Sequence, residues 1–172
     1  MTANIVFPYL EYDEKVYWQK RNVSNKVFEF PPESPGIVKS DFLYGFDNVI
    51  QSTYLVLTEA IFCALTICDQ TCAIGGAEVS DNQVKKIKAL NPKDGVILAI
   101  DNDSAGLKSL VANYKKISKY FPVMCSIPPI ASKDWNGMAK ETDVAETKKY
   151  FEDHIERVTP SLLARVMSNI NW

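Results

Sequence analysis

Three carboxylate side chains follow two apolar segments of this sequence. Glu59 comes after the apolar run 53–58, and Asp101 and Asp103 come after the run 95–100. Ligands of open α/β sheets bind at the edge where the parallel strands end, so we expect these side chains together at such an edge. Carboxylate oxygens are the ligands of a hard divalent cation such as Mg²⁺, which usually also contacts a phosphate. The pattern therefore predicts phosphate chemistry at this edge.

The segments around these carboxylates alternate between strand and helix patterns. Strands are expected at 53–58, 71–74, 96–100 and 121–127, and helices at about 60–68, 81–90, 104–119, 143–157 and from 160 to near 172. Ser80 and Gln83 form a capping box at the start of the second helix. Pro122 indicates an edge position for the strand that contains it. The alternation predicts a parallel sheet with right-handed crossovers.

The first part of the chain has a different pattern. Short strands are expected at 5–10, 15–19 and 26–30, with a polar hairpin turn at 11–14 and a proline-rich loop at 31–36. We therefore divide the chain into a small β-rich N-terminal subdomain at 1–47, an α/β domain at 48–142 and a helical tail at 143–172.

Composition narrows the possible classes of protein. The chain has 172 residues and a formal net charge of −2, so any nucleic-acid binding needs a local patch rather than bulk charge. No apolar run is long enough for a membrane span, and the start lacks the features of a secretory signal. His154 is the only histidine, and the four cysteines lack the spacing of zinc ligands. We expect buried free thiols in a reducing cytoplasm and no catalysis by a Ser-His or Cys-His pair.

Each acidic motif also has an ordinary structural interpretation. A Glu after a strand is commonly a solvated residue at a helix start, and Asp-x-Asp in a turn commonly bonds to nearby backbone. Three observations favour the functional interpretation. The acidic loop follows an almost wholly apolar strand, and Ala105 and Gly106 let the backbone come close to it. The motif 133–136 is expected at the same edge.

The order of these motifs resembles a Toprim domain, the metal-binding fold shared by bacterial-type primases, topoisomerases and some nucleases. The segments that carry the resemblance are 56–64, 73–76, 100–106 and 133–136. The preceding segments 16–21, 26–28, 31–34 and 39–47 resemble the small β-rich subdomain that precedes Toprim in bacterial and phage DNA primases. The resemblance covers about residues 5 to 140 and implies a Rossmann-like parallel sheet flanked by helices.

The resemblance also implies an activity. It implies the catalytic core of a phage-type or plasmid-type DNA primase, a nucleotidyltransferase that joins ribonucleotides into short RNA primers on single-stranded DNA during replication. Glu59, Asp101 and Asp103 are then the catalytic residues and hold one or two Mg²⁺ or Mn²⁺ ions.

Further residues complete the site that the resemblance implies. Arg21, Lys26 and Lys39 are expected to contact nucleotide phosphates or template. Lys133 and Asp134 are expected to close the far side of the site, with Asp134 as a weaker metal candidate.

The resemblance also implies partners. These are single-stranded DNA and ribonucleoside triphosphates, with a replicative helicase or a separate zinc-ribbon template reader left open as a further partner. Trp18 and Trp135 are candidates either for stacking on bases or for packing. The expected location is the cytoplasm of a bacterial or phage-infected cell, without a membrane.

Three positions depart from the family pattern. Ala60 replaces a glycine, Cys63 replaces an acidic residue, and Gly137 stands where the family usually has Asp. These departures and the missing zinc ribbon favour a second hypothesis, a non-catalytic nucleic-acid-binding or replisome module. A third hypothesis is a Toprim nuclease, in which Glu59 serves as the base that activates water.

Overall fold

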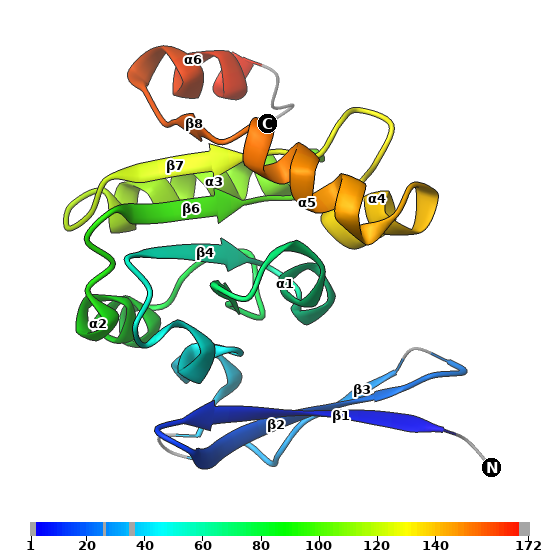
Figure 1. Ribbon diagram of the computed structural model, residues 1–172. Coiled ribbons are helices and arrows are strands. Elements are labelled where there is room, and N and C mark those ends of the chain that lie inside the picture. Colours follow the sequence, from blue (N-terminus) through cyan, green and yellow to red (C-terminus); the bar gives the residue numbers. More distant parts are fainter. Residues whose placement is uncertain (1–2, 26, 35–36, 169–172) are drawn as a thin grey trace.

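The chain forms two sheets, one from each part of the sequence (Figure 1). The computed structural model describes residues 3–25, 27–34 and 37–168. The first sheet is antiparallel, in the order β1 (Asn4–Glu11), β2 (Glu14–Asn22) and β3 (Phe28–Glu29). The β1–β2 turn is tight, with positive φ at Tyr12 and Asp13. Both amides donate to the carboxylate of Asp47, which ties the hairpin to the following segment.

The second sheet has five strands in the order β5-β4-β6-β7-β8. Their bounds are β4 (Tyr54–Thr58), β5 (Thr71–Ala73), β6 (Gly95–Ala99), β7 (Val123–Ser126) and β8 (Glu156–Arg157). β8 alone runs antiparallel to its neighbour. Nearly every residue of β4 and β6 is buried, as expected for parallel strands that are covered on both faces. Two short 3-10 helices, η1 (Lys39–Asp41) and η2 (Phe46–Val49), connect the sheets.

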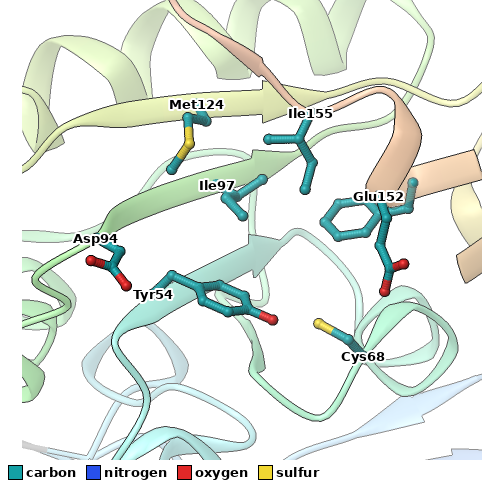
Figure 2. A pocket seen from close by; sticks show the side chains of 8 residues that line it. Tyr54, Cys68, Asp94, Ile97, Met124, Glu152 and Ile155 are labelled. Atoms are coloured by element: carbon teal, nitrogen blue, oxygen red, sulfur yellow. The ribbon is translucent and has the colours of Figure 1, made fainter. Parts of the chain in front are cut away.

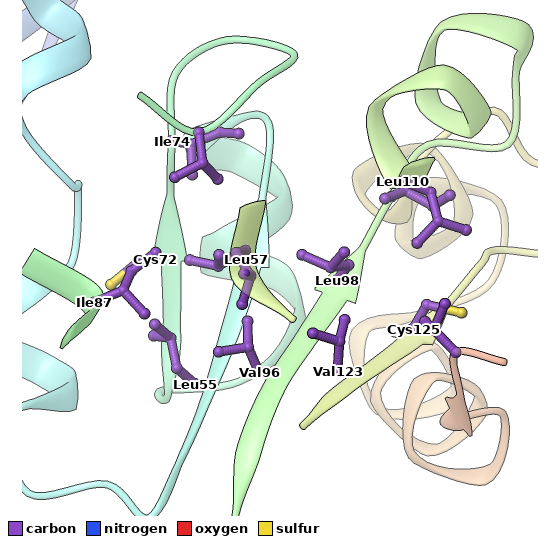
Figure 3. Close-up of a cluster of buried hydrophobic side chains, with 14 of the residues drawn as sticks. Leu55, Leu57, Cys72, Ile74, Ile87, Val96, Leu98, Leu110, Val123 and Cys125 are labelled. Atoms are coloured by element: carbon purple, nitrogen blue, oxygen red, sulfur yellow. The ribbon is translucent and has the colours of Figure 1, made fainter. Parts of the chain in front are cut away.

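Helices cover both faces of the second sheet (Figure 1). On one face lie α2 (Asp81–Leu90), α3 (Ser104–Ile117) and α6 (Pro160–Ser168), and on the other lie α1 (Ile61–Ile67), α4 (Trp135–Glu141) and α5 (Val144–Asp153). Alternate strand residues face opposite ways, so Leu57 and Leu98 pack towards Leu110 of α3 (Figure 3). Val56 and Ile97 contribute to the core on the other face.

Aromatic side chains join the two sheets. Tyr9 contacts the rings of Tyr17 and Tyr44 at centroid distances of 5.3 and 5.4 Å. An ion pair between Glu11 of β1 and Lys86 of α2 adds a charged contact between the N-terminal sheet and the rest of the chain. The N-terminal sheet is therefore held against the second sheet by both apolar and charged contacts.

The structure confirms the α/β fold and the parallel sheet. It also confirms the Ser80–Gln83 capping box. The edge position for the strand after Pro122 was wrong, because β8 pairs with β7, and Pro122 lies just before the strand. The helix expected at 143–157 ends at Asp153, since β8 follows it.

The remaining predictions concern boundaries. The strand expected at 26–30 is reduced to β3 within the described residues. The division of the chain at 47 and 142 stays a prediction, and residues 144–168 pack on the second sheet. Among the described residues, no helix combines the length and the apolar character that a bilayer crossing requires.

Candidate functional site

The carboxyl ends of β4 and β6 bring Glu59 and Asp101 to one edge of the second sheet. The two strands are neighbours, with Leu57 beside Leu98, so the residues that follow them lie close together. Glu59 and Asp101 line the same small cavity, together with Gly106. Glu59 is exposed, whereas Asp101 is half-buried. The structure thus brings together two side chains that are 42 positions apart in the sequence (101 − 59).

Asp101 lies in surroundings that disfavour its ionised form. The pKa of Asp101 is raised to about 6, and burial is the largest cause. The carboxylates of Asp134, Glu59 and Asp103 add to this increase in that order, and the ammonium group of Lys133 opposes it. Repulsion between like charges is relieved when a cation binds among them. The edge therefore has the electrostatics of a cation site.

Asp103 caps helix α3. Its Oδ1 atom accepts a hydrogen bond of 2.9 Å from the Gly106 amide, and its Oδ2 atom lies 3.5 Å from Nζ of Lys133. The bond from Gly106 is the largest cause that lowers the pKa of Asp103, and Lys133 also lowers it. A Cβ at Gly106 would collide with the carbonyl oxygen of Asp101, so the close approach of loop and helix requires glycine. The Asp103 carboxylate is therefore ionised and engaged within the protein.

The loop before α4 brings Lys133 and Asp134 to the same edge. The carbonyl oxygen of Lys133 accepts a bond of 2.8 Å from the Asn102 amide, which joins this loop to the acidic loop. Asp134 caps α4 by accepting a bond of 2.6 Å from the amide of Gly137. The edge therefore carries two aspartates that each cap a helix, and a lysine side chain that is 72% exposed.

Two side chains near this edge are buried and therefore not available to a ligand. Trp135 is fully buried and packs edge-on against Phe151, with ring centroids 5.4 Å apart. Trp135 is therefore a packing residue, and the alternative prediction that it stacks on bases is wrong. Cys63 is also buried, and burial raises the pKa of its thiol to about 12. A neutral thiol thus stands where the family pattern has an acid.

The fit of this edge to a metal ion is incomplete. Within the described residues, no group of three or more His, Cys, Asp or Glu side chains is placed to hold a metal ion. The type of donor nevertheless suits Mg²⁺, which prefers oxygen ligands. Glu59 and Asp101 share a cavity, whereas Asp103 bonds to its own helix and to Lys133. The metal site formed by these three carboxylates therefore stays a prediction.

A cleft of about 170 Å³ opens beside Glu59, between the N-terminal sheet and the second sheet. Its lining includes the side chains of Gln19, Phe28, Phe30, Lys39, Glu59, Ile61 and Phe62. Nζ of Lys39 lies 5.3 Å from the ring centre of Phe30. An added Cβ at Gly75 would lie 3.4 Å from the Lys39 side chain, so this side chain lies directly against the backbone at Gly75. Basic and aromatic groups together suit the phosphates and bases of nucleotides.

Arg21 lies next to this cleft and is held by two aromatic rings. Its Cζ atom lies 5.3 Å from the ring centre of Phe28 and 4.6 Å from that of Phe62. No carboxylate in the described part of the chain forms an ion pair with it, so its N–H groups stay available for an anion. Lys26, the third predicted basic residue, lies outside the described residues.

Sequence reasoning missed the aromatic members of the cleft. The alternation of Phe28 and Phe30 in the segment before the proline-rich loop was the available signal, because such residues share one face of a strand. Phe62 gave no signal, since an aromatic residue in an apolar helix is normally read as core.

Comparisons with known proteins identify relatives of this fold. Residues 56–139 match the Toprim-like family. A DNA primase of Rickettsia bellii is 26% identical over 160 residues, which cover 74% of this chain and 26% of the relative. The chain therefore spans about a quarter of the length of that curated relative.

Solved structures agree with this match. The zinc-binding and RNA polymerase domains of the Aquifex aeolicus primase superpose with a TM-score of 0.74 at 19% identity, over 96% of this chain and 43% of theirs. The RNA polymerase domain of the Mycobacterium tuberculosis primase gives 0.75 at 12% identity, over 96% and 60%. The primase fragment of the bacteriophage T7 primase-helicase gives 0.66 at 19% identity, over 87% and 62%. At these identities the likeness shows a shared fold.

Proposed function

We propose that this chain, which carries a Toprim domain of the type found in DNA primases, is a primase catalytic core. It would join ribonucleotides into short RNA primers on single-stranded DNA. One observation carries the proposal: Glu59, whose charge acts on Asp101, also lines the basic, aromatic cleft with Lys39. The groups that suit a metal ion and the groups that suit a nucleotide therefore lie next to one another.

The carboxylates at the sheet edge have the first role. Glu59, Asp101 and Asp103 would hold Mg²⁺ or Mn²⁺, and Asp134 is a further candidate. When bound, the metal neutralises triphosphate charge and stabilises the attacking and leaving oxygens of a phosphoryl transfer. Because Lys133 is mostly exposed, its side chain can leave Asp103 and pair with a phosphate instead.

The cleft has the second role, which is to bind and orient the nucleotide and the template. Arg21 and Lys39 would pair with phosphates, while Phe28 and Phe30 offer faces on which bases stack. Positioning of this kind supplies much of the rate of phosphoryl transfer, because the protein does little covalent work. Lys26 belongs to the same proposal from the sequence alone.

The partners follow from the same assignment. Single-stranded DNA and ribonucleoside triphosphates are the substrates, in the cytoplasm of a bacterial or phage-infected cell. Among the structural relatives, a Mycobacterium tuberculosis primase domain was solved with a DNA oligomer, and the T7 fragment belongs to a primase-helicase. A helicase and a zinc-ribbon template reader are therefore candidate partners for this chain.

A second candidate function is a nucleic-acid-binding module without catalysis. It is favoured by the pairing of Asp103 with Lys133 and by the missing group of three ligands within the described residues. The neutral thiol of Cys63 also favours this second candidate. Such a module would bind DNA equally well with and without Mg²⁺.

Primer synthesis tests the two candidates. The protein is incubated with single-stranded DNA, labelled ribonucleoside triphosphates and Mg²⁺ or Mn²⁺, beside a variant with Asp101→Asn and Asp103→Asn and a control variant, Asp69→Asn. Template-dependent RNA from the parent and the control, absent from the double variant, supports the primase. DNA binding without RNA synthesis supports the module, and metal-dependent shortening of the DNA would indicate a nuclease.

A further inference from the structure

A second, larger cavity lies at the opposite end of the strands. Its volume is about 400 Å³, and it opens between the end of α1 and the end of α5 (Figure 2). Tyr54, the first residue of β4, lines it, and so does Asp94, which directly precedes β6. The acidic edge with Glu59 and Asp101 lies beyond the other ends of these same strands. The cavity is therefore separate from the proposed primase site.

The floor of this cavity is apolar. Ile97 and Met124 from the sheet line it, with Ile155 beside them, and the Tyr54 ring lies along it (Figure 2). The Tyr54 hydroxyl donates to Oε1 of Gln70 at 3.3 Å, so this hydroxyl already has a hydrogen-bond partner. A cavity of this size with an apolar floor suits an organic ligand.

Both charged groups that line the cavity are carboxylates. Asp94 and Glu152 are exposed and lie on opposite sides of the floor, with Tyr54 between them (Figure 2). Neither carboxylate forms an ion pair with a Lys, Arg or His side chain in the part of the chain that the structure describes. Among the described residues, no cationic side chain lines the cavity. An anionic ligand is therefore disfavoured, and a cation is complementary.

We propose that this cavity binds an organic cation that has an apolar body and an amino group at each end, such as a linear diamine. The apolar body would lie on Ile97 and Met124, and the two ammonium groups would meet Asp94 and Glu152. The Tyr54 ring adds an attractive face for a cation near it. The pairing of two separated charges gives the site a preference for diamines over monoamines.

Cys68 provides a reporter for this site. Among the four cysteines it alone is partly exposed, and it lines the cavity, while Cys63, Cys72 and Cys125 are buried. Iodoacetamide should therefore alkylate Cys68 first, and a Cys68→Ser variant should lose that rapid phase. A ligand in the cavity should slow the alkylation by covering the thiol.

The test compares three probes of equal length on the full chain. They are 1,8-diaminooctane, octylamine and suberate, with glutathione as a control for consumption of the reagent. We expect protection of Cys68 at the lowest concentration of the diamine, at higher concentrations of the monoamine, and none by the dicarboxylate. Asp94→Asn and Glu152→Gln should each raise the half-protecting diamine concentration about two- to fivefold, as for an exposed ion pair.

Three results would overturn the proposal. The first is equal protection by diamine and suberate, and the second is equal protection by diamine and octylamine. The third is an effect of Asp94→Asn and Glu152→Gln no larger than that of Glu146→Gln, an exposed carboxylate on α5 outside the cavity. Calorimetry of diamine binding to the Cys68→Ser variant checks the same affinities without the thiol.

Discussion

The substitution Asp101→Asn should stabilise the folded protein, although it removes a residue of the candidate site. The folded state raises the pKa of this carboxyl from 3.8 to about 6, with burial as the main cause. Each unit is worth about 1.4 kcal/mol, so ionisation in place costs up to about 3 kcal/mol. Partial exposure screens this cost, and we expect a gain of about 1–2 kcal/mol in the free energy of unfolding at pH 7.5.

The gain should depend on pH with a definite sign. Because the pKa is higher in the folded state than in the unfolded state, the cost of ionisation appears as pH rises from 3.8 towards 6 and is complete above that range. At pH 5 the gain from Asp101→Asn should be about half of its value at pH 7.5. Urea unfolding in the presence of EDTA measures both values, and Asp69→Asn is the matched control.

The substitution Asp103→Asn, in contrast, is not expected to stabilise the protein, and comparing the two variants makes the test more specific. The Gly106 amide and Lys133 stabilise the ionised form of Asp103, so neutralising it should not stabilise the protein. The reasoning would be refuted if Asp101→Asn lowered the unfolding free energy at pH 7.5. A gain of equal size at pH 5 and pH 7.5 would refute it as well.

Three further predictions concern the stability of the folded protein. Gly106→Ala should cost roughly 1–3 kcal/mol in urea unfolding, because the added methyl group collides with backbone of the acidic loop. Lys86→Met should lower the free energy of unfolding by about 2–3 kcal/mol, because it leaves the Glu11 side chain, which is only 12% exposed, without its cation. Thermal unfolding measures this loss, with Lys88→Met as the control. Trp135→Ala should cost about 3–5 kcal/mol in the same measurement, while the affinity of the folded fraction for single-stranded DNA, measured by fluorescence anisotropy, stays unchanged.

The acidic edge was predictable from the sequence because parallel strands end at a common edge. Glu59 and Asp101 each follow an apolar run, and this local pattern sufficed to place both of them. The helix that begins after Ser80 was predictable for a similar reason, since its capping box is a local signal. Each of these features depends on a few consecutive residues.

Other features depend on contacts that no local pattern encodes. Arg21 of β2 lies over the ring of Phe62 in helix α1, and only the packing of the N-terminal sheet against the rest of the chain brings the two together. β8 has two residues, too few to show a periodicity. Trp135 follows two charged residues, so its complete burial against α5 was hidden by its neighbours in the sequence.

The central claim is that the acidic edge and the basic, aromatic cleft form one site for a divalent metal ion and a nucleotide. The most direct test is Mn²⁺ binding followed by electron paramagnetic resonance, with and without a ribonucleoside triphosphate. We predict that the protein and the triphosphate together bind Mn²⁺ more tightly than either does alone. Asp101→Asn should abolish this gain, Arg21→Met should weaken it, and Asp69→Asn should preserve it. An equal Mn²⁺ affinity for the parent and Asp101→Asn, with or without the triphosphate, would contradict the claim.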